Sequence, residues 1–117
     1  MNIQNSLQFA ADIRVKTVIS TMESSLTDRL SLNTLSAKVN LSPARLQQLF
    51  KLETGRSPMQ YLKELRLRKA EDLLQTTFHS IKEIAFLCGA TDVSHFVRDF
   101  KKHCGLTPSG FRSARKI

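Results

Sequence analysis

Apolar residues along the chain recur at intervals of three or four, the spacing of a buried helix face. No stretch alternates apolar and polar residues with the period of two that marks a half-buried strand. A first helix is predicted over about 12–26, because apolar residues follow this spacing there: Val15, Val18, Ile19, Met22 and Leu26. The pattern therefore predicts an all-α protein.

Capping residues divide the rest of the first half into two more helices. Ser31 or Asn33 can begin a short helix, and Asn40, which tolerates a left-handed backbone, can end it. The pair Ser42–Pro43 then begins a third helix, because proline lacks only an N–H that the first turn leaves unbonded. We expect this helix to stop at Gly55.

The longest predicted helix covers Ser57 to Gln75, with a cap at Ser57 and no glycine or further proline after Pro58. Its apolar residues gather towards its two ends, namely Met59, Leu62 and Leu65, then Ala70, Leu73 and Leu74. Basic residues lie between them: Lys63, Arg66, Arg68 and Lys69. This pattern predicts a helix that supports two small cores. An ordinary bundle helix with a solvated charged face is the alternative.

The second half carries the same kinds of signal. Ser80 and Glu83 have the spacing of a capping box and begin a helix that Gly89 ends. Asp92 can cap the next helix, and Thr107–Pro108 begins a last short one.

The two halves repeat one pattern of core, glycine and proline positions. At an offset of 50 residues the pairs are Leu46 and Phe96, Phe50 and Phe100, Gly55 and Gly105, Pro58 and Pro108, and Tyr61 and Phe111. Before the turns the offset is 49, so the second turn has one extra residue. The repeated unit, a short helix, a tight turn and a longer helix, is a helix-turn-helix. We therefore predict seven helices forming two helix-turn-helix lobes joined by a long central helix.

The predicted organisation follows from this repeat. Residues 12–56 form the first lobe, 57–76 the linking helix and 77–117 the second lobe. Residues 1–11 are weakly patterned and are expected to be disordered or a linker remnant. Because seven helices occupy the chain, either a sensor or dimerisation domain lies N-terminal in a longer protein, or the chain is a small stand-alone protein.

The charge balance indicates a polyanionic partner. Eighteen Lys and Arg against ten Asp and Glu leave a net charge of +8. This favours nucleic acid first and an anionic membrane surface second. The chain has no run of 18 apolar residues and no secretory signal pattern, so we expect no membrane partner and a cytoplasmic location.

No residue set predicts enzyme chemistry, a cofactor or a metal. Cys88 and Cys104 form no CxxC pair, and His103 next to Cys104 lacks the usual spacing of zinc ligands. Cys88 fits a buried position near a helix end. We find no nucleophile–base pair, no HExxH motif and no phosphate-binding glycine loop, so catalytic residues are not expected.

Two stretches of the chain resemble a known family. LSAKVNLSPARLQQLFKLETGRSPMQYLKELRLRKAEDLL and IKEIAFLCGATDVSHFVRDFKKHCGLTPSGFR are similar to the DNA-binding region of AraC/XylS transcription regulators, and the resemblance covers about 12–115. It implies two recognition helices that enter successive major grooves on one face of DNA. The chain departs from the family at Asn40, where glycine is usual, and at Ala90, where an aromatic is usual. Val93 and Val97 also make the second recognition helix less polar than expected.

Candidate base contacts lie on these two helices. With Leu46, Leu49 and Phe50 inward, the first helix leaves Ala44, Arg45, Gln47, Gln48 and Lys51 outward. The resemblance places Ala44, Gln47 and Gln48 at base-facing positions, with Arg45 beside them. With Phe96 and Phe100 inward, the second helix leaves Ser94, His95, Val97, Arg98 and Lys101. Arg98 is the strongest candidate, because arginine to guanine is the commonest specific contact, whereas His95 could bond a phosphate or cover the turn.

Basic residues around these helices are candidate phosphate contacts: Lys38, Lys51, Arg56, Lys82, Lys101, Lys102 and Arg112. A solvated basic face is the alternative for part of this set. The sequence thus predicts a bacterial sequence-specific DNA-binding transcription regulator, or its DNA-binding domain. The expected partners are double-stranded DNA and RNA polymerase, with this chain as a monomer. A nonspecific DNA-packaging protein or helical adaptor is the alternative.

Overall fold

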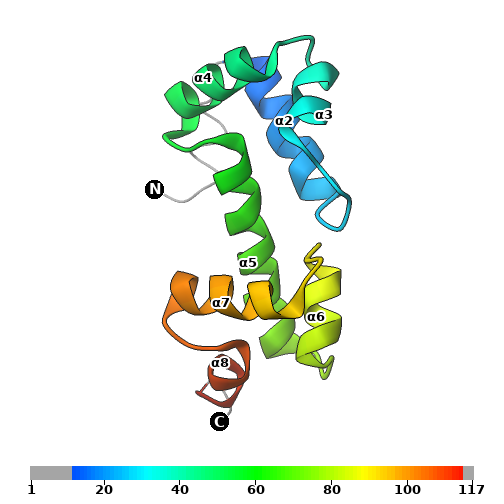
Figure 1. Ribbon diagram of the computed structural model, residues 1–117, viewed down its shortest axis with the longest axis vertical. Helices are drawn as coiled ribbons and strands as arrows, with labels where there is room; N and C mark the ends of the chain where they lie inside the picture. The colour runs from blue at the N-terminus through cyan, green and yellow to red at the C-terminus, as the bar shows by residue number, and fades with distance from the viewer. Residues whose placement is uncertain (1–11, 115–117) are drawn as a thin grey trace. The chain divides into compact units, whose positions relative to one another are not determined.

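The computed structural model describes residues 12–114, and these contain seven α-helices (Figure 1). The helices are α2 (Ile13–Ser24), α3 (Leu32–Lys38), α4 (Pro43–Thr54), α5 (Pro58–Thr76), α6 (Ile81–Leu87), α7 (Val93–Cys104) and α8 (Pro108–Ala114). Within the described residues they confirm the predicted all-α class. The segment 1–11, predicted to be disordered or a linker, lies outside them, as does 115–117.

The helices begin where the capping residues predict. Of the two residues considered for the start of α3, Ser31 is the cap. Ser80 and Glu83 form the predicted capping box, in which the Ser80 N–H donates to the Glu83 carboxylate at 2.8 Å. Ser57 and Gln60 exchange the same pair of bonds at 3.1 and 3.3 Å at the start of α5. Local side-chain hydrogen bonds therefore set these boundaries.

The helix ends agree with the prediction except at α2. Asn40 has a φ of 58°, the left-handed conformation expected of it. The first helix stops at Ser24, two residues before the predicted Leu26. Ser25 leaves the helical backbone with φ −137° and ψ 41°, and the Leu26 carbonyl accepts a hydrogen bond from Arg66 Nε at 3.0 Å. A long-range bond thus draws Leu26 into a loop.

The described chain forms two compact units. Unit 1 contains residues 12–25 and 30–63, and unit 2 contains residues 26–29 and 64–114. The division falls within α5, so the N-terminal part of this helix belongs to unit 1 and its C-terminal part to unit 2. The loop between α2 and α3 belongs to unit 2 although it joins two helices of unit 1.

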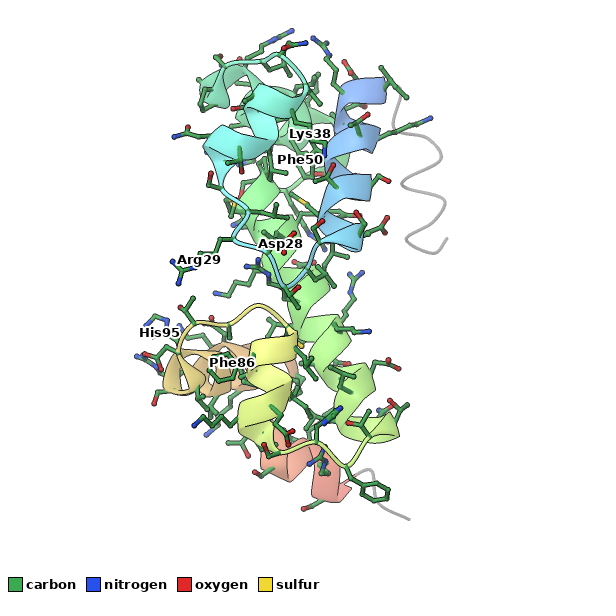
Figure 2. The ribbon with its side chains drawn as sticks, turned by 90° about the vertical axis from the view of Figure 1, so that its right-hand side faces the viewer. Asp28, Arg29, Lys38, Phe50, Phe86 and His95 are labelled. Atoms are coloured by element: carbon green, nitrogen blue, oxygen red, sulfur yellow. The ribbon has the colours of Figure 1, made fainter. Side chains whose placement is uncertain are left out.

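Unit 1 is built around α4, against which both α2 and α3 pack (Figure 1). Phe50 of α4 is fully buried in it (Figure 2) and meets Tyr61 of α5 edge-on, with ring centroids 5.4 Å apart. The buried apolar residues that surround this pair are Val15, Val18, Ile19, Met22, Leu35, Leu46 and Leu62. Met59, expected in this core, is 39% exposed instead, and Tyr61 is buried two positions later in α5. Burial of one such side chain contributes about 1.5–3 kcal/mol.

Unit 2 has a core of the same design. Its buried cluster consists of Leu67, Ala70, Leu74, Ile84, Ala85, Cys88, Phe96 and Phe100. Phe100 of α7 meets Phe111 of α8 edge-on at 5.4 Å, in the way that Phe50 meets Tyr61. Cys88 is 1% exposed and burial raises the pKa of its thiol to about 11, so it is a neutral core residue as the sequence predicts.

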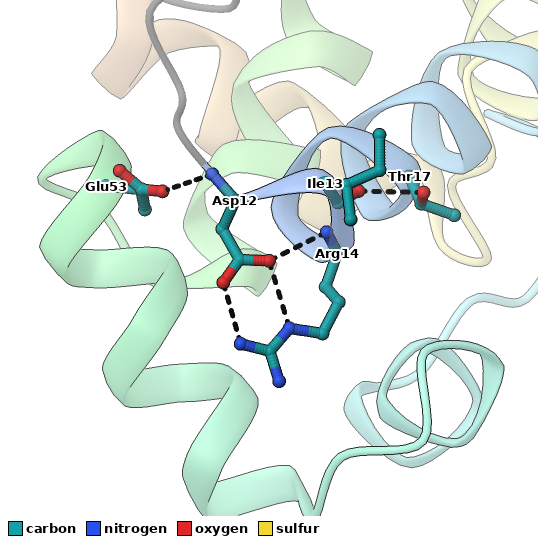
Figure 3. Close-up of polar contacts among 5 residues, drawn as sticks. All are labelled: Asp12, Ile13, Arg14, Thr17 and Glu53. Carbon is teal, nitrogen blue, oxygen red and sulfur yellow. Dashed lines mark hydrogen bonds and ion pairs between the residues drawn. The ribbon is translucent and has the colours of Figure 1, made fainter.

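The start of α2 is held by an acidic cap (Figure 3). The Asp12 carboxylate accepts hydrogen bonds from the Arg14 guanidinium at 2.7 and 3.0 Å and from the Arg14 backbone N–H at 2.8 Å. Its own backbone N–H donates to Glu53 of α4 at 2.8 Å. The Arg14 side-chain and backbone hydrogen bonds lower the pKa of Asp12 from 3.8 to about 2.

Gly89, after α6, is the glycine with the least space around it. Its φ is +83°, and a Cβ at this position would lie 2.4 Å from the Leu26 carbonyl oxygen and 2.9 Å from Arg66 Nε. Gly55 has a similar φ of +80° but no atom within 4 Å of such a Cβ. Gly89 is therefore required both for its backbone conformation and for the close approach of the Leu26 carbonyl.

This difference predicts that Gly89→Ala destabilises the protein more than Gly55→Ala. Both alanines would adopt a left-handed backbone, which costs about 1–2 kcal/mol. At Gly89 the added methyl group also collides with backbone, so we expect a total loss of about 3 kcal/mol. Urea unfolding followed by circular dichroism measures both values. Equal losses for the two variants would contradict the close approach at Gly89.

The Asp12 cap predicts a pH-dependent contribution to stability. Since folding lowers the pKa of Asp12, the contribution is complete above the unfolded value near 4 and is lost as the pH falls towards about 2. Asp12→Asn should therefore be less stable than the wild type at about pH 5, and this difference should disappear below about pH 2. The measurement is the free energy of unfolding across this range, with Asp72→Asn on exposed α5 surface as the control. A pH-independent difference would contradict the assignment.

Candidate nucleic-acid interface

Each unit contains one helix-turn-helix pair. In unit 1 it is α3 and α4, and in unit 2 it is α6 and α7. The first turn closes with a hydrogen bond from Leu41 N–H to the Ser36 carbonyl at 3.0 Å, and the second with one from Ala90 N–H to the Ala85 carbonyl at 2.9 Å. In both pairs the longer helix has 12 residues, so the predicted repeat is present in the structure.

Helix α4 buries one face and exposes the other. Leu46 and Phe50 are both 0% exposed, as predicted, and Leu49 is half-buried. The exposed residues include Ala44, Arg45, Gln47, Gln48 and Lys51, together with Pro43 and Leu52. Ala44, Arg45, Gln47 and Gln48 are predicted base contacts and Lys51 is a predicted phosphate contact, and all of them are exposed on one helix. Glutamine can bond adenine, arginine can bond guanine and alanine can touch a thymine methyl.

Helix α7 likewise buries one face and exposes the other. Ser94, His95, Arg98 and Lys101 are exposed, and Figure 2 shows His95 pointing away from the core of unit 2. Val97, expected to point outward, is half-buried and packs with Val93 against the core of unit 2. This packing explains why α7 carries valines at two positions where a more polar helix was expected.

The two longer helices also differ at their first turn. Ser42, a neutral side chain, caps α4 by accepting the Arg45 N–H. Asp92 caps α7 and accepts the backbone N–H groups of Ser94 and His95 at 2.8 and 3.4 Å. The start of α7 therefore carries a carboxylate, which repels phosphate where the start of α4 does not.

Six of the seven basic residues proposed as phosphate contacts are exposed: Lys38, Lys51, Arg56, Lys82, Lys101 and Lys102. The seventh, Arg112, is half-buried in α8. Its guanidinium donates hydrogen bonds to the carbonyls of Leu74 and Thr77, both at 3.2 Å. These bonds cap the C-terminal end of α5, so the structure gives Arg112 a structural role.

Arg66 was expected among exposed basic residues and has a different position. It is half-buried in α5 and donates to the carbonyls of Leu26 and Asp28 at 3.0 and 2.8 Å. Burial lowers the pKa of this guanidinium from its ordinary value. No local sequence signal marks this contact, because its partners lie 40 and 38 residues away.

Two titratable residues at the C-terminal end of α7 have polar contacts within unit 2. His103 Nε2 lies 2.6 Å from Glu71 Oε1, and Cys104 Sγ lies 3.5 Å from the Leu106 carbonyl oxygen. Among residues 12–114 no three His, Cys, Asp or Glu side chains are placed to hold a metal ion. In the same range no helix combines the length and apolar character that crossing a membrane requires.

Comparison with known proteins agrees with this geometry. A family model described as a helix-turn-helix domain matches residues 35–114, which is more than half of the chain. The chain is 31% identical over 104 residues to the HTH-type transcriptional regulator GbdR of Pseudomonas aeruginosa, covering 89% of this chain and 28% of GbdR. It thus spans less than a third of that relative.

Solved structures with this fold include two informative ones. The C-terminal domain of the two-component response regulator yesN from Fusobacterium nucleatum is 35% identical with a TM-score of 0.82, covering 86% of this chain and 99% of that one. The DNA-binding domain of AdpA, solved in complex with a target DNA, is 27% identical with a TM-score of 0.83, covering 86% and 91%. The chain belongs to the AraC-type helix-turn-helix domain family.

Proposed function

We propose that this chain is the DNA-binding part of a bacterial sequence-specific transcription regulator. The observation that carries the proposal is the pair of helix-turn-helix units, each of which buries an aromatic face of its longer helix and leaves polar side chains outside. Membership of the AraC-type family supports it, as does similarity to the AdpA domain that was solved on DNA. The chain has no enzymatic step in this function.

The two longer helices read bases in this proposal. Helix α4 contributes Ala44, Arg45, Gln47 and Gln48, and α7 contributes Ser94, His95 and Arg98. Arg98 bonds guanine bidentately, and Gln48 bonds adenine.

Phosphate contacts come from the six exposed basic residues on and near these helices. They are six of the 18 lysines and arginines of the chain, and they add affinity without sequence preference. The proposed partner is double-stranded DNA, bound by this chain as a monomer in the cytoplasm, and RNA polymerase is the proposed partner in activation. Binding needs no cofactor.

Variants of the base-reading residues test the proposal on a site selected from a random DNA pool. Arg98→Ala and Gln48→Ala should each weaken the selected site by about 1–3 kcal/mol, whereas Lys102→Ala should weaken selected and random DNA alike. If about six phosphates are contacted, the log–log salt slope should be roughly −5. Gel shifts at several salt concentrations measure both quantities.

Arg98→Lys is the matched control, since it keeps the charge and removes the bidentate fork. It should lose affinity for the selected site and keep affinity for random DNA. If no sequence is enriched in the selection and all DNA is bound alike, a packaging protein is favoured. A salt slope near zero would remove DNA as the partner.

We further propose that the two units read two parts of one site in successive major grooves. These grooves recur on one face of the duplex at about 10.5 base pairs. Inserting five base pairs between the two parts turns one of them by about 170° to the opposite face, so affinity should fall towards that for random DNA. Inserting ten base pairs controls for length. Both parts of the site then lie on the same face of the duplex again, but the distance between them is longer. Affinity within about twofold of the uninterrupted site after both insertions would show that one unit binds alone.

A further inference from the structure

The loop at residues 26–29 is fixed in unit 2 by a single side chain. Arg66 Nε donates to the Leu26 carbonyl at 3.0 Å, and its Nη2 donates to the Asp28 carbonyl at 2.8 Å. One planar guanidinium thus holds the backbone on both sides of Thr27. Since hydrogen bonds from charged donors are stronger than neutral ones, this contact orders a short loop that has no helix of its own.

Gly89 brings the same loop against the turn of the second helix-turn-helix pair. Any side chain at Gly89 would place its Cβ 2.4 Å from the Leu26 carbonyl oxygen and 2.9 Å from Arg66 Nε. Gly89 follows α6 and lies in the turn that leads to α7. The turn and the loop are therefore in direct contact within unit 2.

Arg29 is the residue that this arrangement presents to solvent. It directly follows the fixed Asp28 carbonyl and is exposed, and within residues 12–114 no hydrogen bond or ion pair engages its side chain. In Figure 2 the Arg29 side chain projects from unit 2 on the same side as His95, which lies in the first turn of α7.

We propose that Arg29 is a further DNA phosphate contact beside the second helix-turn-helix pair, and that Arg66 is the positioning residue that holds it there. This inference rests on the proposed function. Guanidinium binds phosphate through two parallel N–H bonds, and a loop ordered before binding loses less conformational entropy when DNA arrives. Arg66 itself directs its donors to carbonyls and is half-buried, so it does not act as the contact.

The inference predicts a specific pattern of salt dependence on a random-sequence duplex of about three helical turns. Arg29→Ala should weaken binding about three- to tenfold and make the log–log salt slope shallower by about 1. Arg29→Lys, which keeps the charge, should retain the wild-type slope. Lys16→Ala removes one charge from exposed α2, which lies outside both helix-turn-helix pairs, and should leave the slope unchanged.

Arg66→Met removes the donors and the charge and keeps most of the side-chain volume, so the double variant with Arg29→Ala is needed to separate positioning from simple loss of charge. If Arg66 acts through Arg29, the double variant should bind within about twofold of Arg29→Ala alone, because the second change has no contact left to disturb. Independent, multiplied losses would overturn the positioning role. Thermal unfolding of every variant shows whether it is folded at the assay temperature, and if Arg66→Met is not, the Arg29 variants decide the contact alone.

If the Arg29→Ala variant shows the same log–log salt slope as the wild type, the inference is overturned. The proposed function then still stands if the wild type binds a selected site in a salt-dependent way. If the wild type itself shows no salt-dependent DNA binding, the proposed function fails and the inference fails with it.

Discussion

The edge-on contact between two aromatic rings is the constraint on which each unit depends. Phe50 and Tyr61 meet at 5.4 Å and 81° in unit 1, and Phe100 and Phe111 meet at 5.4 Å and 81° in unit 2. Each pair joins the C-terminal part of a recognition helix to the helix that follows it, and so fixes the rotation of that recognition helix about its own axis. This rotation determines which residues of α4 and α7 are exposed. Polar residues of α4 and α7 can face a partner because the opposite side of each helix has one well-packed orientation.

Much of this could be predicted from the sequence because its causes are local. Ser31, Ser80 and Asp92 cap helices through bonds to residues two or three positions away, and glycine and proline mark the same boundaries in both halves. The burial of Phe50 and Phe100 follows from helical spacing. What could not be predicted depends on residues far apart in the chain. Arg66 and Arg112 have the composition of a solvated basic surface, yet both bind carbonyls 35 to 40 residues away, and only the packed structure brings these groups together.

The two halves share a plan but present different surfaces. Helix α4 begins at a neutral serine cap and exposes two adjacent glutamines, whereas α7 begins at an aspartate cap and uses Val93 and Val97 for packing. A buried aliphatic side chain gives its helix stability and no hydrogen-bonding capacity. At the repeat position of the exposed Gln47, α7 thus has Val97, which packs on its core. The two helix-turn-helix pairs therefore share one frame of core and capping positions and differ in the residues that they expose.

The placement of the two cysteines gives the protein a chemical probe of its own motions. Both belong to unit 2, where Cys88 is buried with its thiol pKa raised to about 11 and Cys104 is half-buried at the end of α7. Thiol alkylation requires an accessible thiolate, so Cys88 can react only when its surroundings open. The rate at which it is alkylated would then report the opening free energy of unit 2 separately from that of unit 1, without any engineered label.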